Sequence, residues 1–420
     1  MNQSAFLLSL FDEAVRVADP MICVPTALPP KPDKLLVIGA GKASARMAEA
    51  VEEAWGPCDG LIITRYGYER PLQGLKLRSA AHPVPDQAGV EATRELRALL
   101  ETADEDTFVL ALISGGGSAL MIDPAGDVTL EDKQAVNQSL LACGAPITQM
   151  NLVRKHLSRV KGGQLAAAAY PAKLLALMIS DVPGDDPAFI ASGPTVGDAS
   201  TPSDARSVID CYAVSLPASA KAVLDSETGV VPPGDERLSK TTNQVIAAPS
   251  QSLAAAKAIA EKAGIAVTIL GDALEGEARE LGQTHARQAL KLQSEITSPV
   301  LLLSGGECTV TRTGDGAGGP NAEYALSLAV ALDGTPDIHA IACDTDGVDG
   351  APDTKGHEVA GALVTPQTLE RAKAQGLSAA DYLSRNDAHS FFREVEGQVT
   401  PGPTLTNVND FRAILIEAQS

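Results

Sequence analysis

Four apolar runs in this sequence each end in a turn that is rich in glycine or in acidic residues. The runs begin at residues 34, 108, 299 and 338 and read KLLVIGAGKAS, FVLALISGGGSA, PVLLLSGGE and IHAIACDTDGVDG. Short runs of leucine and β-branched residues predict strands that are buried on both faces of a parallel sheet. In α/β proteins, ligands bind where such strands end and helices begin. We therefore expect an α/β fold with a ligand site at these turns.

The length of 420 residues exceeds what one ordinary core serves, so the sequence predicts two domains. The best linker candidate is the polar stretch 226–242, which contains two prolines and two glycines. Strand and helix patterns alternate on both sides of it, which predicts mostly parallel sheets in both halves. We expect a Rossmann-like N-terminal domain over residues 1–235 and a smaller α/β C-terminal domain over residues 236–420.

The composition disfavours several classes of binding partner. The 33 basic and 53 acidic residues give a formal charge of −20, which disfavours nucleic acid and anionic membranes. No apolar run approaches the ~20 residues that span a bilayer, and the N-terminal segment has the pattern of an amphipathic helix, not of a signal peptide. Six scattered cysteines without a C-x-x-C pair fit a cytoplasmic chain. The expected partner is a small molecule, and the oligomeric state is left open.

The first glycine-rich turn, residues 39–44, reads GAGKAS and follows a predicted strand. It resembles the dinucleotide fingerprint G-x-G-x-x-G with Ser44 in the third glycine's place. Thr64 and Arg65 stand where an acidic residue usually ends the second strand, and Arg65 would suit a 2′-phosphate. The turn is not a P-loop, because Leu36 occupies the position of that motif's first glycine.

Lys42 lies at the predicted start of a helix, where a cation is unfavourable against the helix dipole. That cost is better explained if an anion binds there; the alternative is a tight turn with a solvated lysine. The second glycine-rich turn, Ser114–Ser118, has three consecutive glycines, whose ordering costs much entropy in a plain connector. We expect it to bind an anion through backbone N–H groups.

Two acidic turns follow predicted buried strands, at residues 180–186 and 343–350. Carboxylates at strand ends suit Mg²⁺, which takes one or two of them together with phosphate oxygens and water. The alternative is that each is an ordinary Asx turn or helix cap. The carboxylates in question are Asp181, Asp185, Asp344 and Asp346.

A basic island covers residues 151–163 of this acidic chain. Arg154 and Lys155 are the side chains that we expect to bind a substrate carboxylate; the alternative is a solvated face of an amphipathic helix. His82 and His156 are candidate acids or bases, although a lone histidine is more often structural.

Taken together, these blocks resemble the class II glycerate kinases, also called the MOFRL family. The matching stretches run from residue 37 to 411 and read VIGAGKAS, HPVPD, ISGGGSAL, NLVRKHLSRVKGGQLA, ISDVPGDDPAFIASGPTVGD, LLSGGECTV, GGPNAEYAL, DTDGVDG and GPTLTNVNDF. The resemblance implies a two-domain α/β enzyme that phosphorylates D-glycerate on its 2-hydroxyl with ATP and Mg²⁺, with its active site in the cleft between the domains. Many members carry Gly-Gly-Arg-Asn where this chain has Gly319-Pro320-Asn321, so the family's cation at that position has no counterpart here.

The resemblance implies that Lys42 is a catalytic candidate, and we add Asp181 as the second one. The expected phosphate- or nucleotide-binding residues are Gly39, Gly41, Ser44, Ser114, Gly115, Gly116, Gly117 and Ser118. The substrate ligands are Arg154 and Lys155, and the metal ligands are Asp185, Asp344 and Asp346; which carboxylate acts as base stays open.

Two other functions remain open at this point. An NAD(P)H-dependent hydroxypyruvate reductase is the first, because proteins of this group often carry that label and the first turn resembles a dinucleotide fingerprint. A non-catalytic sensor is the second, although no basic recognition helix is present.

Overall fold

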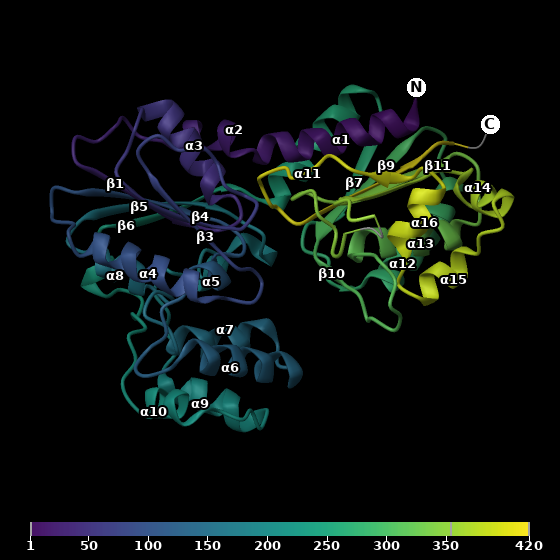
Figure 1. The fold of residues 1–420 in the computed structure, drawn as a ribbon. Helices are drawn as coiled ribbons and strands as arrows, with labels where there is room; N and C mark the ends of the chain where they lie inside the picture. Colours follow the sequence, from purple (N-terminus) through teal and green to yellow (C-terminus); the bar gives the residue numbers. More distant parts are fainter. Residues whose placement is uncertain (1, 353–354, 419–420) are drawn as a thin grey trace. The chain divides into compact units, whose positions relative to one another are not determined.

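The computed structural model describes residues 2–352 and 355–418, which form two compact units (Figure 1). The N-terminal unit is Pro20–Ile246, and the C-terminal unit combines the residues up to Asp19 with those from Ala247 onward. Each unit has its own sheet. In the part of the chain that the structure describes, no helix is both long and apolar enough to cross a membrane. All six cysteines are free thiols.

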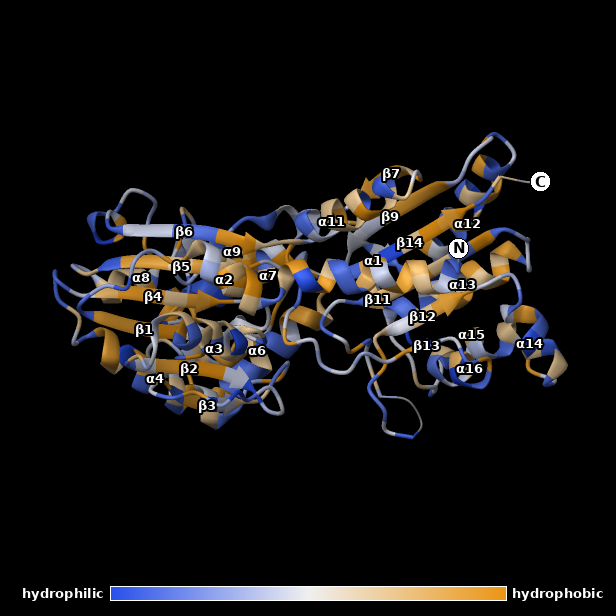
Figure 2. Cartoon of the chain, turned by 90° about the horizontal axis from the view of Figure 1, so that it is seen from above, coloured by the Kyte–Doolittle hydropathy of each residue, from blue (hydrophilic) through white to orange (hydrophobic). Residues whose placement is uncertain are grey.

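The N-terminal unit is built on a six-stranded sheet with the order β3-β2-β1-β4-β5-β6. Neighbouring strands from β3 to β5 pair in parallel. This strand order is that of dinucleotide-binding Rossmann folds, so the predicted Rossmann-like domain is confirmed. Apolar residues run through β1, β2, β4 and β5 (orange in Figure 2), as expected of strands covered on both faces. The strands are β1 Leu35–Ala40, β2 Gly60–Arg65, β3 Lys76–Ala80, β4 Phe108–Ile113, β5 Lys173–Ile179 and β6 Thr241–Ala247.

Helices cover this sheet on both faces, with α3 on one side and α4, α5 and α8 on the other (Figure 1). Helices α6, α7, α9 and α10 form a further layer, which encloses a second small core around Val136, Leu140 and Val153. The bounds are α2 Pro20–Ala27, α3 Ser44–Trp55, α4 Gln87–Leu100, α5 Gly117–Leu120, α6 Leu130–Ala142, α7 Ile147–His156, α8 Gln164–Ala169, α9 Pro202–Cys211 and α10 Ala218–Leu224. Short 3₁₀ helices are η1 Pro183–Asp185, η2 Ile190–Ser192 and η3 Glu236–Leu238.

The C-terminal unit has a mixed sheet with the order β13-β12-β11-β14-β9-β7. Our expectation of a mostly parallel sheet in this half is wrong, because among the described pairings of this six-stranded sheet only β7 and β9 run in parallel. The C-terminal strand β14 inserts between β11 and β9 and runs antiparallel to both. An apolar run indicates that a strand is buried on both faces of its sheet. It does not indicate whether the strand runs parallel or antiparallel to its neighbours. The strands are β7 Ala266–Gly271, β9 Val300–Gly306, β11 Ile338–Asp344, β12 Gly361–Val364, β13 Gln398–Val399 and β14 Asp410–Ile416, with a two-stranded sheet of β8 Gly276–Glu277 and β10 Cys308–Thr309.

Helix α1 (Gln3–Ala18) packs in the C-terminal unit, which differs from the predicted division into 1–235 and 236–420. Its apolar stripe, which includes Leu7, Leu10 and Phe11, lies against residues of β9, β11 and β14. Strand β6, which falls after the predicted boundary, completes the N-terminal sheet. An amphipathic pattern shows that a helix has a buried face but does not show which core that face will cover. The other helices of this unit are α11 Pro249–Lys262, α12 Ala278–Gln293, α13 Pro320–Leu332, α14 Thr368–Ala374, α15 Ala379–Ser384 and α16 Ala388–Glu394.

The attachment of α1 can be tested with Phe11→Ala. Phe11 is 1% exposed and its ring centroid lies 6.1 Å from that of Phe411, so truncation leaves a cavity in the core of the C-terminal unit. We expect a loss of about 3–5 kcal/mol in the free energy of unfolding of that unit in urea. Val330→Ala, at an exposed site of the same unit, is the control and should change it by about 0.5 kcal/mol or less. Equal effects of the two substitutions would contradict the packing of α1.

Candidate active site

The turns after β1 and β4 pack on each other where the strand order of the N-terminal sheet reverses. The Lys42 N–H donates to the Gly115 carbonyl at 2.8 Å, and the Ser114 N–H donates to the Ala40 carbonyl at 3.2 Å. The Ser114 hydroxyl accepts from the Ala43 N–H at 3.0 Å. Ligands of open α/β sheets bind in the crevice at this reversal point. The fold therefore places both glycine-rich turns where a site is expected.

Close packing explains why two positions in these turns are glycine. A Cβ on Gly41, whose φ is +146°, would lie 2.1 Å from the Ser114 hydroxyl oxygen. A Cβ on Gly115 would lie 1.8 Å from a carboxylate oxygen of Asp181. At Gly41 the backbone of Ser114 leaves no room for a side chain, and at Gly115 a side chain would displace the Asp181 carboxylate, so the two turns are closely packed and Asp181 lies beside the second one.

Four of the predicted phosphate-binding residues are buried in this packing. Gly39 lies inside β1, where a Cβ would be 2.7 Å from the Leu112 carbonyl oxygen, and Gly41 lies against Ser114. The Ser44 hydroxyl donates to the Leu112 carbonyl at 2.9 Å and is fully buried. In a dinucleotide fingerprint the second glycine lets the backbone approach the pyrophosphate. Here Ser114 fills that place.

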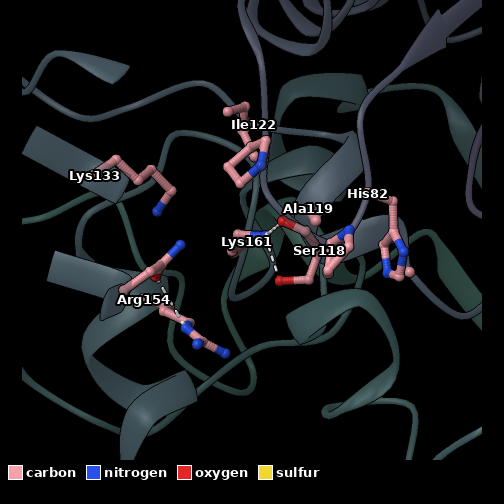
Figure 3. Close-up of a pocket in the computed structure, with 11 residues that line it drawn as sticks. His82, Ser118, Ala119, Ile122, Lys133, Arg154 and Lys161 are labelled. Atoms are coloured by element: carbon pink, nitrogen blue, oxygen red, sulfur yellow. Dashed lines mark hydrogen bonds between the residues drawn. The ribbon is translucent and has the colours of Figure 1, made fainter. Parts of the chain in front are cut away.

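A cavity of about 140 Å³ opens beside the second turn (Figure 3). Its walls come from the loop between β3 and α4, from the second turn with α5 and the loop after it, from α6 and α7, and from the loop before α8. The lining residues are His82, Pro83, Pro85, Gly116, Ser118, Ala119, Ile122, Lys133, Asn137, Arg154 and Lys161. Three of the described residues that line it are lysine or arginine, and none is aspartate or glutamate. The cavity is therefore electropositive within a strongly acidic chain.

Of the three cations of the cavity, Lys133 and Lys161 are buried and Arg154 is half-buried, and no described carboxylate forms an ion pair with any of them. Lys133 is 4% exposed, and its side-chain ammonium has no hydrogen bond or ion pair to any described residue. Burial and then the charge of Arg154 lower the pKa of Lys133 to about 8. Lys161 is 1% exposed and donates to the Ser118 carbonyl at 2.6 Å and to the Ser118 hydroxyl at 2.8 Å. Burial lowers the pKa of Lys161 well below its usual range, and nearby cations add to this effect. Such a cluster is costly unless an anion binds to it.

Arg154 is held in place by two amides. Its Nε donates to the Asn137 side-chain oxygen at 3.1 Å, and one of its terminal nitrogens donates to that of Asn151 at 3.3 Å. Burial lowers the pKa of Arg154, but a guanidinium stays charged at neutral pH. Its planar fork is suited to a carboxylate.

The side chains of Lys42 and His82 meet at Gly116. A Cβ on Gly116, whose φ is +77°, would lie 3.1 Å from Nε2 of His82 and 3.2 Å from Cγ of Lys42. The N–H groups of Gly115 and Gly116 donate to no acceptor in the described part of the chain. The second turn therefore presents N–H donors, a lysine and a histidine near one wall of the cavity.

Lys155, which was predicted to bind the substrate carboxylate together with Arg154, lies outside the cavity. It donates to Asp198 at 2.6 Å and is 4% exposed. His156 is also buried, with hydrogen bonds of 2.6 Å to Thr228 and 3.1 Å to Ser200. Sequence reasoning missed Lys133, a single lysine among the polar residues of α6. Lys161 lay within the predicted basic island, but no pattern distinguished it from its neighbours.

The acidic turns are distributed over both units. Asp181 lies beside Gly115, and Asp185, with φ of +55°, ends η1. At the end of β11, Asp344 accepts from the Asp346 N–H at 2.9 Å and Asp346 accepts from the Val348 N–H at 2.8 Å, as in Asx turns. Among the described residues, no group of three or more His, Cys, Asp or Glu side chains is arranged to hold a metal ion.

Asp349, in the same C-terminal turn, has a structural partner. Its carboxylate accepts from the N–H groups of Asn321 and Ala322, each at 2.8 Å, and so caps the N-terminus of α13. Burial raises the pKa of Asp349 to about 7, against the opposing effect of these hydrogen bonds. Part of this acidic turn therefore stabilises the fold of the C-terminal unit.

The contrast between Lys133 and Lys155 gives a test of the site. Lys133→Met should raise the stability of the ligand-free protein by about 1–3 kcal/mol at pH 7, because it removes a buried charge without a partner. Since the pKa of Lys133 is about 8 when folded and 10.5 is its ordinary value, the penalty is complete below pH 8. The difference from wild type should shrink as the pH rises from 8 towards 10.5. Urea unfolding over this pH range measures it.

Lys155→Met is the matched control, and we expect it to lower the free energy of unfolding where Lys133→Met raises it. Lys155→Met removes the lysine that pairs with the half-buried Asp198, so we expect a loss of about 1–3 kcal/mol in the free energy of unfolding. If both substitutions shift the free energy of unfolding in the same direction, Lys133 is a structural residue and the cavity is not an anion site.

Comparisons with known proteins agree with this geometry. A model described as a domain of unknown function (DUF4147) matches residues 6–225, and the MOFRL family model matches residues 300–410. A protein of Agrobacterium vitis named "Putative hydroxypyruvate reductase" is 50% identical, covering 98% of this chain and 94% of its own. The D-glycerate 2-kinase of Thermotoga maritima is 37% identical, covering 90% of this chain and 89% of its own. The crystal structure of a glycerate kinase from Thermotoga maritima aligns with a TM-score of 0.88 at 35% identity, covering 98% of this chain and 99% of that one. The chain therefore belongs to the MOFRL family, the class II glycerate kinases.

Proposed function

We propose that this protein transfers the γ-phosphoryl group of ATP to the 2-hydroxyl of D-glycerate, giving 2-phosphoglycerate and ADP. The observation that carries the proposal is Lys133, a buried cation without a partner in a cavity that it shares with Arg154 and Lys161. A small carboxylic acid supplies the missing charge. The cavity of about 140 Å³ is well below the ~300 Å³ at which pockets for drug-sized ligands begin, so it suits glycerate and not a whole nucleotide.

In this proposal the substrate carboxylate binds Arg154 through its fork, with Lys133 and Lys161 as further donors. Lys155 stays with Asp198 and has no part in binding. Lys42 and the N–H groups of Gly115 and Gly116 receive the transferring phosphoryl group. Phosphoryl transfer depends mainly on positioning and on neutralising charge, which these donors provide.

Mg²⁺ is part of the proposal because ATP-dependent phosphoryl transfer uses it to neutralise phosphate charge. Carboxylate oxygens are ligands that suit this ion. In the N-terminal unit, Asp181 and Asp185 are the residues that would hold it. Asp344 and Asp346 of the C-terminal unit are a separate pair of candidates.

The reductase alternative finds less support in the geometry. Ser114 lies against Gly41, where a pyrophosphate would approach the backbone. Its hydroxyl also accepts the hydrogen bond of the Ala43 N–H, so that N–H is not available to a phosphate. Arg65, which would bind a 2′-phosphate, has its guanidinium stacked 4.4 Å from the ring centre of Tyr68. Neither observation favours a nicotinamide cofactor at the first turn.

A direct assay separates the two functions. The protein is incubated with D-glycerate, ATP and Mg²⁺, and separately with hydroxypyruvate and NADPH. We expect ADP only when D-glycerate is present, and a product that enolase dehydrates without a mutase, as 2-phosphoglycerate but not 3-phosphoglycerate would be. Oxidation of NADPH in the absence of ATP, with no glycerate-dependent ADP, would contradict the proposal.

Lys42→Ala tests the phosphoryl-binding role. We expect kcat to fall by at least about 10²-fold, because a preorganised charge at the transferring group is lost. The melting temperature should stay within a few degrees of wild type, since Lys42 is only half-buried. Lys76→Ala, an exposed lysine paired with Glu95 on the same unit, is the control and should leave kcat unchanged. Wild-type turnover in Lys42→Ala would remove the residue from the mechanism.

Metal dependence is tested by chelation and by Asp→Asn variants. Excess EDTA should abolish turnover, and added Mg²⁺ should restore it. Asp181→Asn and Asp344→Asn should each raise the Mg²⁺ concentration needed for half-maximal rate, by about tenfold or more. Asp104→Asn, at an exposed ion pair with Lys34, should not. If the Mg²⁺ requirement of both variants equals that of wild type, the acidic turns are structural.

A further inference from the structure

The proposed reaction releases the proton of the substrate hydroxyl, and the residues so far assigned do not receive it. None of the described residues lining the cavity is a carboxylate. Asp181 lies beside Gly115 and is not among the residues that line the cavity. The proton acceptor must therefore be sought among the other polar groups of the lining.

Most of these groups are unsuited to accept a proton. Arg154 stays charged, and Asn137 is a neutral amide. Lys133 and Lys161 are the counter-charges for the carboxylate, and binding an anion favours their protonated forms. The Ser118 hydroxyl accepts from Lys161 and shares a hydrogen bond of 2.9 Å with the hydroxyl of Ser192. His82 remains as the lining residue whose neutral side chain carries a nitrogen that can accept a proton.

The positions of these side chains give a direction to the bound acid. Lys133, Arg154 and Lys161 lie on one side of Ser118, and His82 lies on the other (Figure 3). A carboxylate held by the cations directs the rest of a three-carbon acid towards His82. A Cβ added to Gly116 would lie 3.1 Å from Nε2 of His82 and 3.2 Å from Cγ of Lys42, so both side chains approach Gly116 from the same side. The imidazole is thus beside the residue that we assign to the phosphoryl group.

We propose that His82 is the general base that accepts the proton of the substrate hydroxyl. The O–H bond breaks and its proton passes to an imidazole nitrogen, while the hydroxyl oxygen forms a bond to the γ-phosphorus of ATP. The bond from that phosphorus to the bridging oxygen breaks, and its electron pair leaves with ADP. The imidazolium then loses its proton to solvent. This inference rests on the proposed function.

The charged groups that face His82 come from several elements. Lys42 belongs to the turn after β1, Lys133 to α6, Arg154 to α7 and Lys161 to the loop before α8, with Asp181 on the far side of Gly115. Among these groups the cations outnumber the carboxylate, and a nearby cation favours the neutral form of an imidazole, which a base requires. Binding of an acid and of ATP reduces this effect.

The test uses His82→Gln in the full-length protein, with D-glycerate, ATP and Mg²⁺. We expect kcat to fall by at least about 10²-fold, while KM for D-glycerate stays within about threefold of wild type, because the carboxylate ligands are intact. The fall of kcat at acid pH in the wild type, where imidazole is protonated, should be absent from the residual activity of the variant. His357→Gln makes the same change at an exposed site of the other unit and should leave rate and pH profile unchanged.

Each outcome decides the inference. A smaller loss of kcat, or an unchanged acid limb in the variant, overturns the role of His82. Should His82→Gln fail to fold, His82→Ala is assayed with and without imidazole; at least tenfold rescue supports the role, and no rescue overturns it. If the wild type itself forms no ADP in response to D-glycerate, the proposed function fails. This failure is distinct from a failure of the His82 role, because it is seen in the wild type before any variant is assayed.

Discussion

The contact between the turns after β1 and β4 is the constraint on which the candidate site depends. Gly41 and Gly115 are the positions where no Cβ fits, because Ser114 and Asp181 occupy the space. The same contact fixes Gly116, against which Lys42 and His82 lie. A Rossmann-like sheet usually offers this crevice to a pyrophosphate. Here Ser114 packs against Gly41, and the cavity lies between the second turn and residues of α6 and α7.

That open space is lined with charges that the fold itself does not neutralise. Burying Lys133 and Lys161 without a carboxylate lowers the stability of the ligand-free protein. Lys155, one residue from Arg154, shows how the same chain treats a structural lysine, since it pairs with Asp198. In the described part of the chain, the lysines of this cavity lack a carboxylate partner, whereas the structural Lys155 has one. We take this contrast as support for anion binding in the cavity, because proteins keep unpaired buried charges at sites where a ligand provides the partner.

Local features of the site were predictable from the sequence, and tertiary ones were not. The strand runs and their glycine turns are contiguous, so β1, β4 and their reversal point follow from pattern alone. Arg154 was predicted from a cluster of charges, and it does line the cavity. Lys133 was missed, because the burial of one lysine in α6 depends on what packs above it. The packing of α1 in the C-terminal unit and the antiparallel insertion of β14 depend in the same way on long-range contacts.

The central claim is that buried cations of this cavity bind the carboxylate of the substrate. Calorimetric titration of D-glycerate at pH 8.5, repeated in buffers of different ionisation enthalpy, measures the protons taken up on binding. With the pKa of Lys133 at about 8, part of the free protein has lost that proton at this pH, and a bound carboxylate should restore it. We expect net proton uptake in the wild type and a smaller uptake in Lys133→Met. Binding of D-glycerate with no proton uptake, or with equal uptake in both proteins, would contradict the account.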